Sequence, residues 1–191
     1  MSKNGPKMKK NIILIGYRCT GKTSVGKKIS ERLEMPFYDT DDLIKKETGK
    51  TIQELVAEKG WPFFRDKERE IIDRLSGLQG CVIAPGGGVI RDERNVAALA
   101  RHGVFVWLRA DVGTIAARMA GDCDSTGQRP SLTGGDPIAE IEQVLRERLP
   151  DYEKLADFSV DTSSVSIEAA AERISDFIQQ SIEGESCPEA R

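Results

Sequence analysis

The eight residues 16–23 (GYRCTGKT) restrict the fold of this 191-residue chain more than any other feature. They match the pattern G-x-x-x-x-G-K-[ST], lie directly after the apolar run 11–15 and lead into the amphipathic stretch 22–33. A strand that passes through such a loop into a helix is how many α/β domains bind nucleotide phosphates. Because a chance match in this context is rare, the pattern predicts a nucleotide-binding α/β domain.

Short apolar runs recur along the rest of the chain, with amphipathic stretches between them. This alternation predicts a P-loop NTPase fold of the α/β class, a five-stranded parallel sheet flanked by helices. The predicted strands cover residues 11–15, 37–38, 81–84, 104–108 and 158–160. The predicted helices cover residues 22–33, 62–75, 92–101, 111–119, 137–152 and 166–182. We expect one domain over residues 11–182, between a disordered extension at 1–10 and a disordered tail at 183–191.

Residues 121–137 (GDCDSTGQRPSLTGGDP) interrupt the alternation with a polar, glycine-rich segment. A connection of this length inside a compact domain is usually functional or disordered, and we interpret it as a mobile lid. In a closed lid, Arg129 would reach the transferring phosphoryl group, stabilise its charge and help to exclude water. The alternative is a loop arginine that faces solvent.

The composition favours small-molecule substrates. With 28 Lys and Arg against 31 Asp and Glu, the net charge of −3 does not suggest the clustered cations that nucleic-acid binding requires. The four cysteines form no C-x-x-C pair and His102 is the only histidine, so neither a zinc site nor a disulfide framework is predicted. The first apolar run is too short for a signal peptide or a membrane span. We expect a cytoplasmic monomer that binds neither membrane nor nucleic acid.

The loop 16–23 has the chemistry that a nucleotide requires. Its glycines allow backbone conformations closed to other residues, so that successive N–H groups and the helix N-terminus can surround phosphates. Lys22 adds a positive charge, and the Thr23 hydroxyl is placed to ligate Mg²⁺. The predicted nucleotide-binding residues are Gly16, Arg18, Cys19, Thr20, Gly21, Lys22, Thr23, Ser24 and Arg129.

A GTPase switch would use the same kind of loop. It also needs an apolar strand that ends in D-x-x-G and an N-K-x-D sequence that reads guanine. The D-x-x-G at residues 124–127 lies in the polar segment, and N-K-x-D does not occur in the sequence. The sequence therefore favours an enzyme with a second substrate over a signalling GTPase.

Two carboxylates follow the second predicted strand, at Asp39 and Asp41. We expect their side chains to leave the strand end on the same side, near the edge where parallel sheets bind ligands. Asp39 could then serve Mg²⁺ opposite Thr23, while Asp41 accepts or orients the proton of an attacking hydroxyl. The alternative is a solvated helix cap at Asp41 or Asp42.

Arginines and glycines supply the remaining candidates. Arg65 and Glu68 share one helix face, so that the carboxylate could brace the guanidinium; an exposed ion pair of little energetic value is the alternative. Arg148 lies near a helix end, where it would otherwise be an ordinary C-terminal cation. The three glycines 86–88 end a buried strand and permit close approach of a ligand to the backbone; the alternative is a plain turn.

The segments GYRCTGKT, YDTDD, FFRDKE, PGGGV, QRPSL and RERLPDYEKLAD, in this order and at these separations, resemble the shikimate kinase family. The resemblance covers about residues 11–182 and implies a nucleoside monophosphate kinase-like fold, with a shikimate-binding segment near 41–71 and an adenine-contacting loop near 163–165. It implies a kinase that phosphorylates shikimate with ATP and Mg²⁺ in aromatic amino-acid biosynthesis. A related metabolite kinase, such as one for gluconate, a nucleoside monophosphate kinase and a non-catalytic nucleotide-binding protein are the alternatives.

Residue roles follow from the resemblance position by position. Asp41 would be the base or orienter, and Lys22 and Arg129 would stabilise the transferring group. Thr23 and Asp39 would serve Mg²⁺. The residues that would hold or support shikimate are Asp41, Arg65, Glu68, Gly86, Gly87, Gly88 and Arg148. Forked hydrogen bonds from two arginines suit the carboxylate of shikimate, and an aspartate suits its hydroxyls.

Cys19 departs from the family pattern, which often has glycine at this position. An ordinary residue avoids strain only if its backbone angle φ is negative, and we therefore expect a negative φ at Cys19. The thiol would lie beside bound ATP, so that sensitivity to oxidants or alkylating agents is a further hypothesis.

Overall fold

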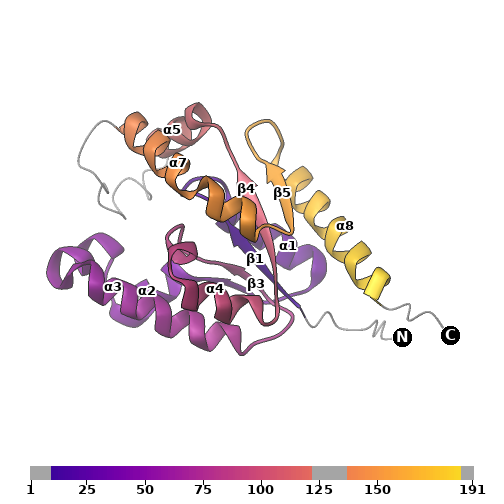
Figure 1. The fold of residues 1–191 in the computed structure, drawn as a ribbon, viewed down its shortest axis with the longest axis horizontal. Coiled ribbons are helices and arrows are strands. Elements are labelled where there is room, and N and C mark those ends of the chain that lie inside the picture. The colour runs from indigo at the N-terminus through magenta and orange to yellow at the C-terminus, as the bar shows by residue number, and fades with distance from the viewer. Residues whose placement is uncertain (1–9, 122–136, 186–191) are drawn as a thin grey trace.

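A computed structural model describes residues 10–121 and 137–185. Five strands form one sheet in the order β2-β3-β1-β4-β5, and every neighbouring pair is parallel (Figure 1). The strands are β1 (Asn11–Ile15), β2 (Phe37–Asp39), β3 (Val82–Ala84), β4 (Gly103–Arg109) and β5 (Phe158–Asp161). The predicted five-stranded parallel α/β fold is confirmed.

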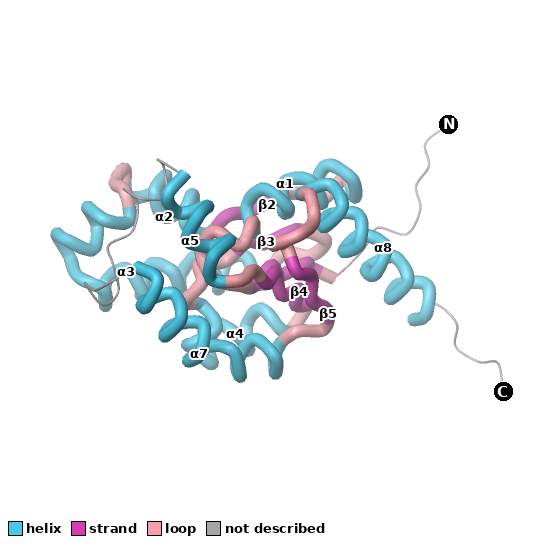
Figure 2. The backbone as a smooth tube through the Cα atoms, turned by 90° about the horizontal axis from the view of Figure 1, so that it is seen from above, coloured by secondary structure: helices cyan, strands magenta, loops and turns pink. Residues whose placement is uncertain are grey.

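Helices cover both faces of the sheet (Figure 2). They are α1 (Lys22–Leu33), α2 (Thr40–Thr48), α3 (Ile52–Ser76), the 3-10 helix η1 (Val89–Arg91), α4 (Glu93–Ala100), α5 (Val112–Gly121), α7 (Pro137–Leu155) and α8 (Ile167–Glu185). Successive residues of β1 pack on opposite faces, as the two-residue period of a strand requires. Ile13 and Ile15 join the core beneath α3 and α4, whereas Ile12 and Leu14 join the core beneath α1 and α8.

The region after β2 differs from the sequence prediction, which had no helix between residues 38 and 62. Asp39 caps α2 by accepting hydrogen bonds from the backbone N–H groups of Asp41 and Asp42. Thr51 and Glu54 form a capping box that starts α3 ten residues earlier than expected. Gly60, at φ 79° and ψ 168°, kinks α3 immediately before the predicted helix start. The T-x-x-E spacing is a helix-start signal that was available in the sequence.

Several predictions concern residues outside the described ranges. The lid predicted at 121–137 is described only at its ends, where Gly121 closes α5 and Pro137 opens α7. Most of the predicted extension at 1–10 and of the tail at 183–191 also lies outside, although α8 continues to Glu185, beyond its predicted end at 182. Among the helices that the structure describes, none has an apolar stretch long enough to cross a membrane.

Candidate active site

Three neighbouring strands end at the same edge of the sheet. β1 leads into residues 16–23, the phosphate loop; β2 leads into Asp39 and α2; and β3 leads into residues 86–88, the triglycine loop. Because β2, β3 and β1 are adjacent and parallel, their carboxyl ends place these three segments side by side. Ligands of open α/β sheets bind at such an edge.

The phosphate loop is held by its own backbone. Gly16 has φ 146°, and a Cβ there would lie 2.5 Å from the Leu108 carbonyl oxygen, so only glycine fits. Lys22 Nζ donates to the carbonyl oxygens of Gly16 at 2.9 Å and Tyr17 at 2.7 Å. Gly21 precedes α1, whose N-terminus has no side-chain cap. The N–H groups of this helix terminus are therefore suited to bind an anion.

The backbone conformation predicted for Cys19 is wrong. Cys19 has φ 59°, in the left-handed region, instead of a negative φ. A residue with a Cβ adopts this conformation at a cost of roughly 1–2 kcal/mol. The Cys19 side chain is partly exposed. Its reactivity remains a prediction.

Two other residues of the phosphate loop have distinct environments. Thr20 is 1% exposed, and its hydroxyl donates to the Tyr17 carbonyl oxygen at 2.8 Å, so that this side chain braces the loop. Ser24 is exposed in the first turn of α1. If Thr20 binds phosphate as predicted, it does so through its backbone N–H. Ser24 could use either its backbone N–H or its exposed hydroxyl.

Arg118, which no sequence pattern marks as functional, joins the phosphate loop to the residue that follows β5. Its Nη1 donates to the Cys19 carbonyl oxygen at 3.2 Å and to the Thr162 hydroxyl at 3.1 Å, and its Nη2 donates to the Thr162 carbonyl oxygen at 2.5 Å. The predicted adenine-contacting loop, 163–165, follows Thr162 directly. Arg118 looks like any basic residue in the last turn of a helix, and only the fold brings its partners together.

Asp39 and Thr23 meet next to the phosphate loop. The Thr23 hydroxyl donates to Asp39 Oδ2 at 2.7 Å. Burial raises the pKa of Asp39, and the nearby charge of Asp41 raises it further. Asp41 lies in the first turn of α2, so the two carboxylates leave a strand end and a helix, not one strand as predicted; the helix cap is Asp39 and not Asp41 or Asp42.

Arg65 and Glu68 form the predicted pair on α3. Arg65 Nη1 lies 2.5 Å from Glu68 Oε2, and the Glu68 side chain is 1% exposed, which argues against a weak surface ion pair. The Arg65 guanidinium also lies over the rings of Trp61 and Phe64, at 5.4 and 5.1 Å from their centroids. These contacts restrict the orientation of the arginine.

The triglycine loop contacts both predicted arginines. Arg148 Nη1 donates to the Gly87 carbonyl oxygen at 2.6 Å, and a Cβ on Gly88 would lie 2.7 Å from both terminal nitrogens of Arg65. The Gly86 N–H donates to the buried Thr40 hydroxyl at 3.0 Å, which ties the loop to α2. Glycine at these positions therefore lets the guanidinium groups approach the backbone.

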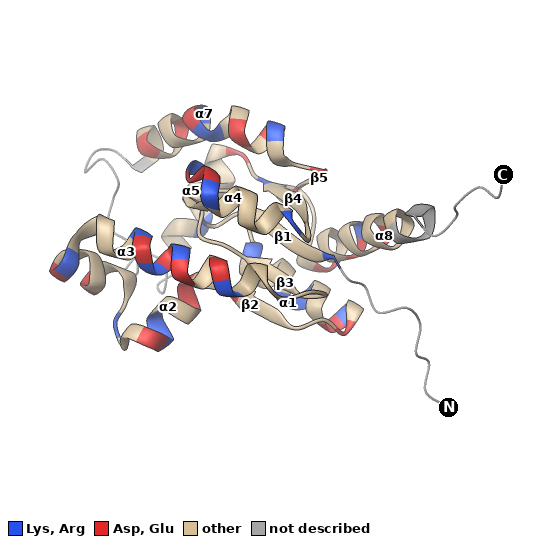
Figure 3. Cartoon of the chain, turned by 60° about the horizontal axis from the view of Figure 1, so that its bottom comes forward, with Lys and Arg blue, Asp and Glu red and all other residues tan. Residues whose placement is uncertain are grey.

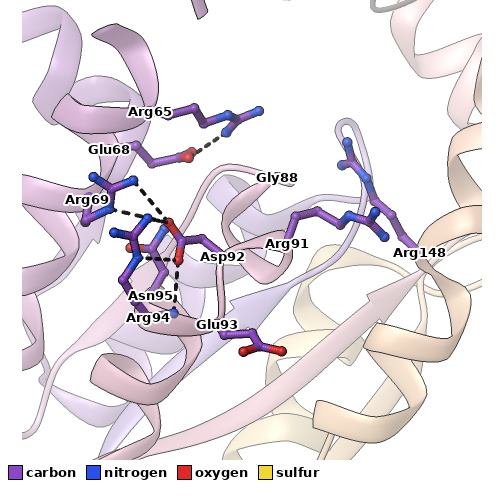
Figure 4. A pocket seen from close by; sticks show the side chains of 10 residues that line it. All are labelled: Arg65, Glu68, Arg69, Gly88, Arg91, Asp92, Glu93, Arg94, Asn95 and Arg148. Atoms are coloured by element: carbon purple, nitrogen blue, oxygen red, sulfur yellow. Dashed lines mark hydrogen bonds and ion pairs between the residues drawn. The ribbon is translucent and has the colours of Figure 1, made fainter. Parts of the chain in front are cut away.

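A pocket of about 540 Å³ opens between α3, η1, α4 and α7; we call it the acid pocket (Figure 4). Sequence reasoning predicted four of its lining residues, Arg65, Glu68, Gly88 and Arg148. It missed Arg69, Arg91, Asp92, Glu93, Arg94 and Asn95. Asp92 bridges Arg69 and Arg94, and its hydrogen bond with Arg94 is the main reason that its pKa falls to about 2.

Five of the ten residues that line the pocket are arginines and three are carboxylates, so the lining carries net positive charge. Arg91 lies 3.2 Å from Asp151, whereas Arg148 has no carboxylate partner among the described residues. Acidic and basic residues are interspersed along the ribbons of α3 and α7 (Figure 3). Arg129 lies outside the described residues, so its predicted role stays a prediction. An anionic small molecule matches the chemistry of this pocket.

The fold and the site define a P-loop kinase of a small metabolite, with a phosphate loop and an acid pocket at one sheet edge. A family model described as shikimate kinase matches residues 18–179. The shikimate kinase of Syntrophus aciditrophicus is 45% identical over 165 residues, which cover 82% of this chain and 85% of that one. The chain therefore belongs to the shikimate kinase family, whose activity is the ATP-dependent phosphorylation of shikimate in aromatic amino-acid biosynthesis.

Solved structures agree with this placement. The shikimate kinase of Acinetobacter baumannii in complex with shikimate superposes with a TM-score of 0.83 at 28% identity, covering 95% of this chain and 97% of that one. A gluconokinase from Sinorhizobium meliloti has a TM-score of 0.55 at 18% identity, covering 95% of this chain and 99% of that one. This second likeness concerns the fold alone.

Proposed function

We propose that the chain transfers the γ-phosphate of ATP to the 3-hydroxyl of shikimate, giving shikimate 3-phosphate and ADP, through the residues at this sheet edge. The observation that carries the proposal is the contact of the triglycine loop with its neighbours. A Cβ on Gly87 would lie 3.2 Å from the Gly16 carbonyl oxygen and 3.5 Å from Arg148 Nη1. The phosphate loop and the acid pocket are thus separated by little more than one glycine.

Arg65 and Arg148 hold the carboxylate of shikimate in this proposal. Guanidinium groups make forked, charge-assisted hydrogen bonds to carboxylates. The buried Glu68 carboxylate fixes Arg65, and the Gly87 carbonyl fixes Arg148. Because the triglycine loop has no side chains, its backbone can approach the ring of shikimate and its hydroxyls closely.

Asp41 orients the hydroxyl that is phosphorylated and accepts its proton. Asp41 lies in the first turn of α2, where its backbone N–H donates to Asp39 Oδ1 at 3.0 Å. Lys22 and, from the lid, Arg129 stabilise the negative charge that develops on the transferring phosphoryl group. Positioning and charge stabilisation are the main requirements of phosphoryl transfer.

Thr23 and Asp39 fit a Mg²⁺ ion. Their oxygen atoms are hard donors 2.7 Å apart beside the phosphate loop. Among the described residues no group of three or more His, Cys, Asp or Glu could form an all-protein metal site. That pattern suits Mg²⁺, which is usually bound through one or two protein oxygens together with substrate phosphates. When bound, the ion would neutralise phosphate charge, and Thr23 and Asp39 would hold it directly or through water.

The enzyme is further proposed to act as a cytoplasmic monomer that binds neither membrane nor nucleic acid. The net charge of −3 supports the expectation that nucleic acid is not bound. Size-exclusion chromatography with light scattering at assay concentration should give a mass near 21.0 kDa. A mass of twice that value would contradict the monomer.

The function is tested by ADP release from purified protein supplied with MgATP. Shikimate, gluconate, AMP and CMP are offered in turn, with an acceptor-free control. We expect turnover with shikimate alone, and mass spectrometry should identify shikimate 3-phosphate. Turnover with gluconate or a nucleotide, or none with any acceptor, would show that the acid pocket serves a different substrate.

A further inference from the structure

A buried ion pair joins the phosphate loop to α7. Arg18 Nη2, from the loop, lies 2.5 Å from Glu140 Oε1, in the first turn of α7. The Glu140 side chain is 2% exposed and that of Arg18 is 20% exposed. A carboxylate at this depth needs a close cation, because desolvating a charge costs several kcal/mol. The pair is therefore a fixed connection, unlike the mobile ion pairs of a surface.

The neighbouring side chains hold the same connection. Tyr17 is 2% exposed and packs in one cluster with Ile141 and Val144 of α7. The Arg18 guanidinium lies 5.5 Å from the centre of the Tyr17 ring. The phosphate loop is thus attached to α7 by both an ion pair and apolar packing.

The same face of α7 also carries an arginine of the acid pocket. Glu140, Val144, Arg148 and Tyr152 recur every four residues, the spacing that aligns side chains on one face of a helix. Glu140 contacts the phosphate loop, and Arg148 contacts the triglycine loop. The two are about 12 Å apart along the helix axis at 1.5 Å per residue. One rigid helix face therefore contacts both substrate sites.

We propose that Glu140 is a positioning residue which, through Arg18, holds the phosphate loop to α7 and thereby couples nucleotide binding to the placement of Arg148. The proposal rests on the proposed function, since it assigns Arg148 to the acid substrate. Nucleotide binding fixes the phosphate loop, the ion pair fixes the N-terminal end of α7, and the helix fixes Arg148. Acid binding is then tighter when nucleotide is present.

The competing role for Glu140 is simple charge neutralisation of Arg18 beside the phosphates. In that case removing the carboxylate strengthens nucleotide binding and leaves the effect of nucleotide on acid binding unchanged. The two roles therefore predict different results for one substitution.

The experiment measures the dissociation constant of shikimate by calorimetry with and without saturating MgADP. In the wild-type protein we expect MgADP to tighten shikimate binding by about 5- to 150-fold, the usual range of coupling between two sites. In Glu140→Gln the ratio should fall below about twofold, with nucleotide-free shikimate binding little changed. Glu142→Gln, on the exposed face of the same helix, is the matched control and should retain the wild-type ratio.

Breaking a buried pair can prevent folding, so a second variant accompanies the first. Arg18→Met combined with Glu140→Met removes both charges, which is often tolerated where a single removal is not. In this double variant, too, MgADP should tighten shikimate binding by less than about twofold. A wild-type ratio of 1, or a ratio that survives in both variants, would overturn the proposal. Absence of shikimate binding to the wild-type protein would instead contradict the proposed function.

Discussion

The phosphate loop is a run of eight consecutive residues whose backbone N–H groups are proposed to bind phosphate, whereas the acid pocket is lined by residues from the region of α3, η1, α4 and α7. The loop depends on backbone angles, such as φ 146° at Gly16 and φ 94° at Gly21. The pocket depends on guanidinium groups held by partners far away in sequence, such as Arg148 on the Gly87 carbonyl.

This difference separates phosphate binding, which is general, from recognition of the acid substrate, which is specific. A backbone site binds any phosphate of suitable size, because its donors do not depend on side-chain identity. A side-chain site recognises the shape and charge of one ligand, and it changes whenever one side chain changes. Substitutions in the two regions should therefore affect different kinetic constants.

Substitution of Asp41 by Asn should have the largest effect. The amide cannot accept the hydroxyl proton, so kcat should fall about 10²- to 10⁴-fold, the usual contribution of a positioned base. The ADP dissociation constant should stay within about twofold, because the phosphate loop is intact. Steady-state kinetics and calorimetry measure the two quantities.

Asp42→Asn is the matched control for this substitution. Asp42 is the next residue, is exposed, and pairs with Lys45 at 2.6 Å. Its kcat should stay close to that of the wild-type protein. If Asp41→Asn kept a kcat within a few-fold of wild type, the assignment of Asp41 as base or orienter would be wrong.

Removal of Arg148 should act mainly on the acid substrate. Arg148→Ala should raise KM for shikimate about 10- to 150-fold, the equivalent of a lost hydrogen bond to a charged group, while the dissociation constant of ADP measured without shikimate changes little. Arg91→Ala is the comparison, since Arg91 lines the same pocket but is 56% exposed and pairs with Asp151. Equal KM values for the two variants would contradict a specific carboxylate contact by Arg148.

The contrast also accounts for what the sequence could predict. The phosphate loop is local, so its pattern and its strand-loop-helix context were sufficient to locate it, and β1 and α1 were predicted at their observed bounds. The strands were found because buried parallel strands are short apolar runs. The first half of α3 was missed because the capping box Thr51–Glu54 was not recognised.

The acid pocket was predicted only where the family pattern marked a residue. Arg65 and Arg148 belong to such motifs. Arg69 and Asn95 are ordinary members of the helices α3 and α4, and Arg91 ends the short helix η1, until the fold brings them together. Arg118 was missed for the same reason, since its partners lie 99 and 44 residues away. Local sequence spacing does not reveal contacts between distant segments, which explains why these residues were not predicted.

Asp39→Asn should stabilise the protein in the absence of nucleotide and metal. Burial and the charge of Asp41 raise the Asp39 pKa, so the charged carboxylate destabilises the folded state above its usual pKa range. Asparagine removes the charge and still caps α2. At pH 7 the melting temperature of the variant should therefore lie above that of the wild-type protein.

The pH dependence gives the control for Asp39→Asn. As the pH falls and Asp39 binds its proton in the folded state, the wild-type protein loses the unfavourable charge, and the two melting temperatures should converge near pH 4. Scanning calorimetry across this pH range measures the difference between the two melting temperatures and its sign. A melting temperature of the variant below that of wild type at pH 7 would show that the charged Asp39 stabilises the empty site.

Cys19→Gly should have the smallest effect, and it tests whether the phosphate loop depends on backbone angles alone. Glycine removes roughly 1–2 kcal/mol of left-handed strain but adds about 0.5–1 kcal/mol of chain entropy, so the free energy of unfolding should rise by about 0.5 kcal/mol. Glu34→Gly is the matched control, because Glu34 has φ 53° at the end of α1, away from the loop. Similar gains in both variants, with unchanged ADP affinity, would assign the effect to backbone strain; a weaker ADP affinity in Cys19→Gly alone would show that the Cys19 side chain also shapes the phosphate site.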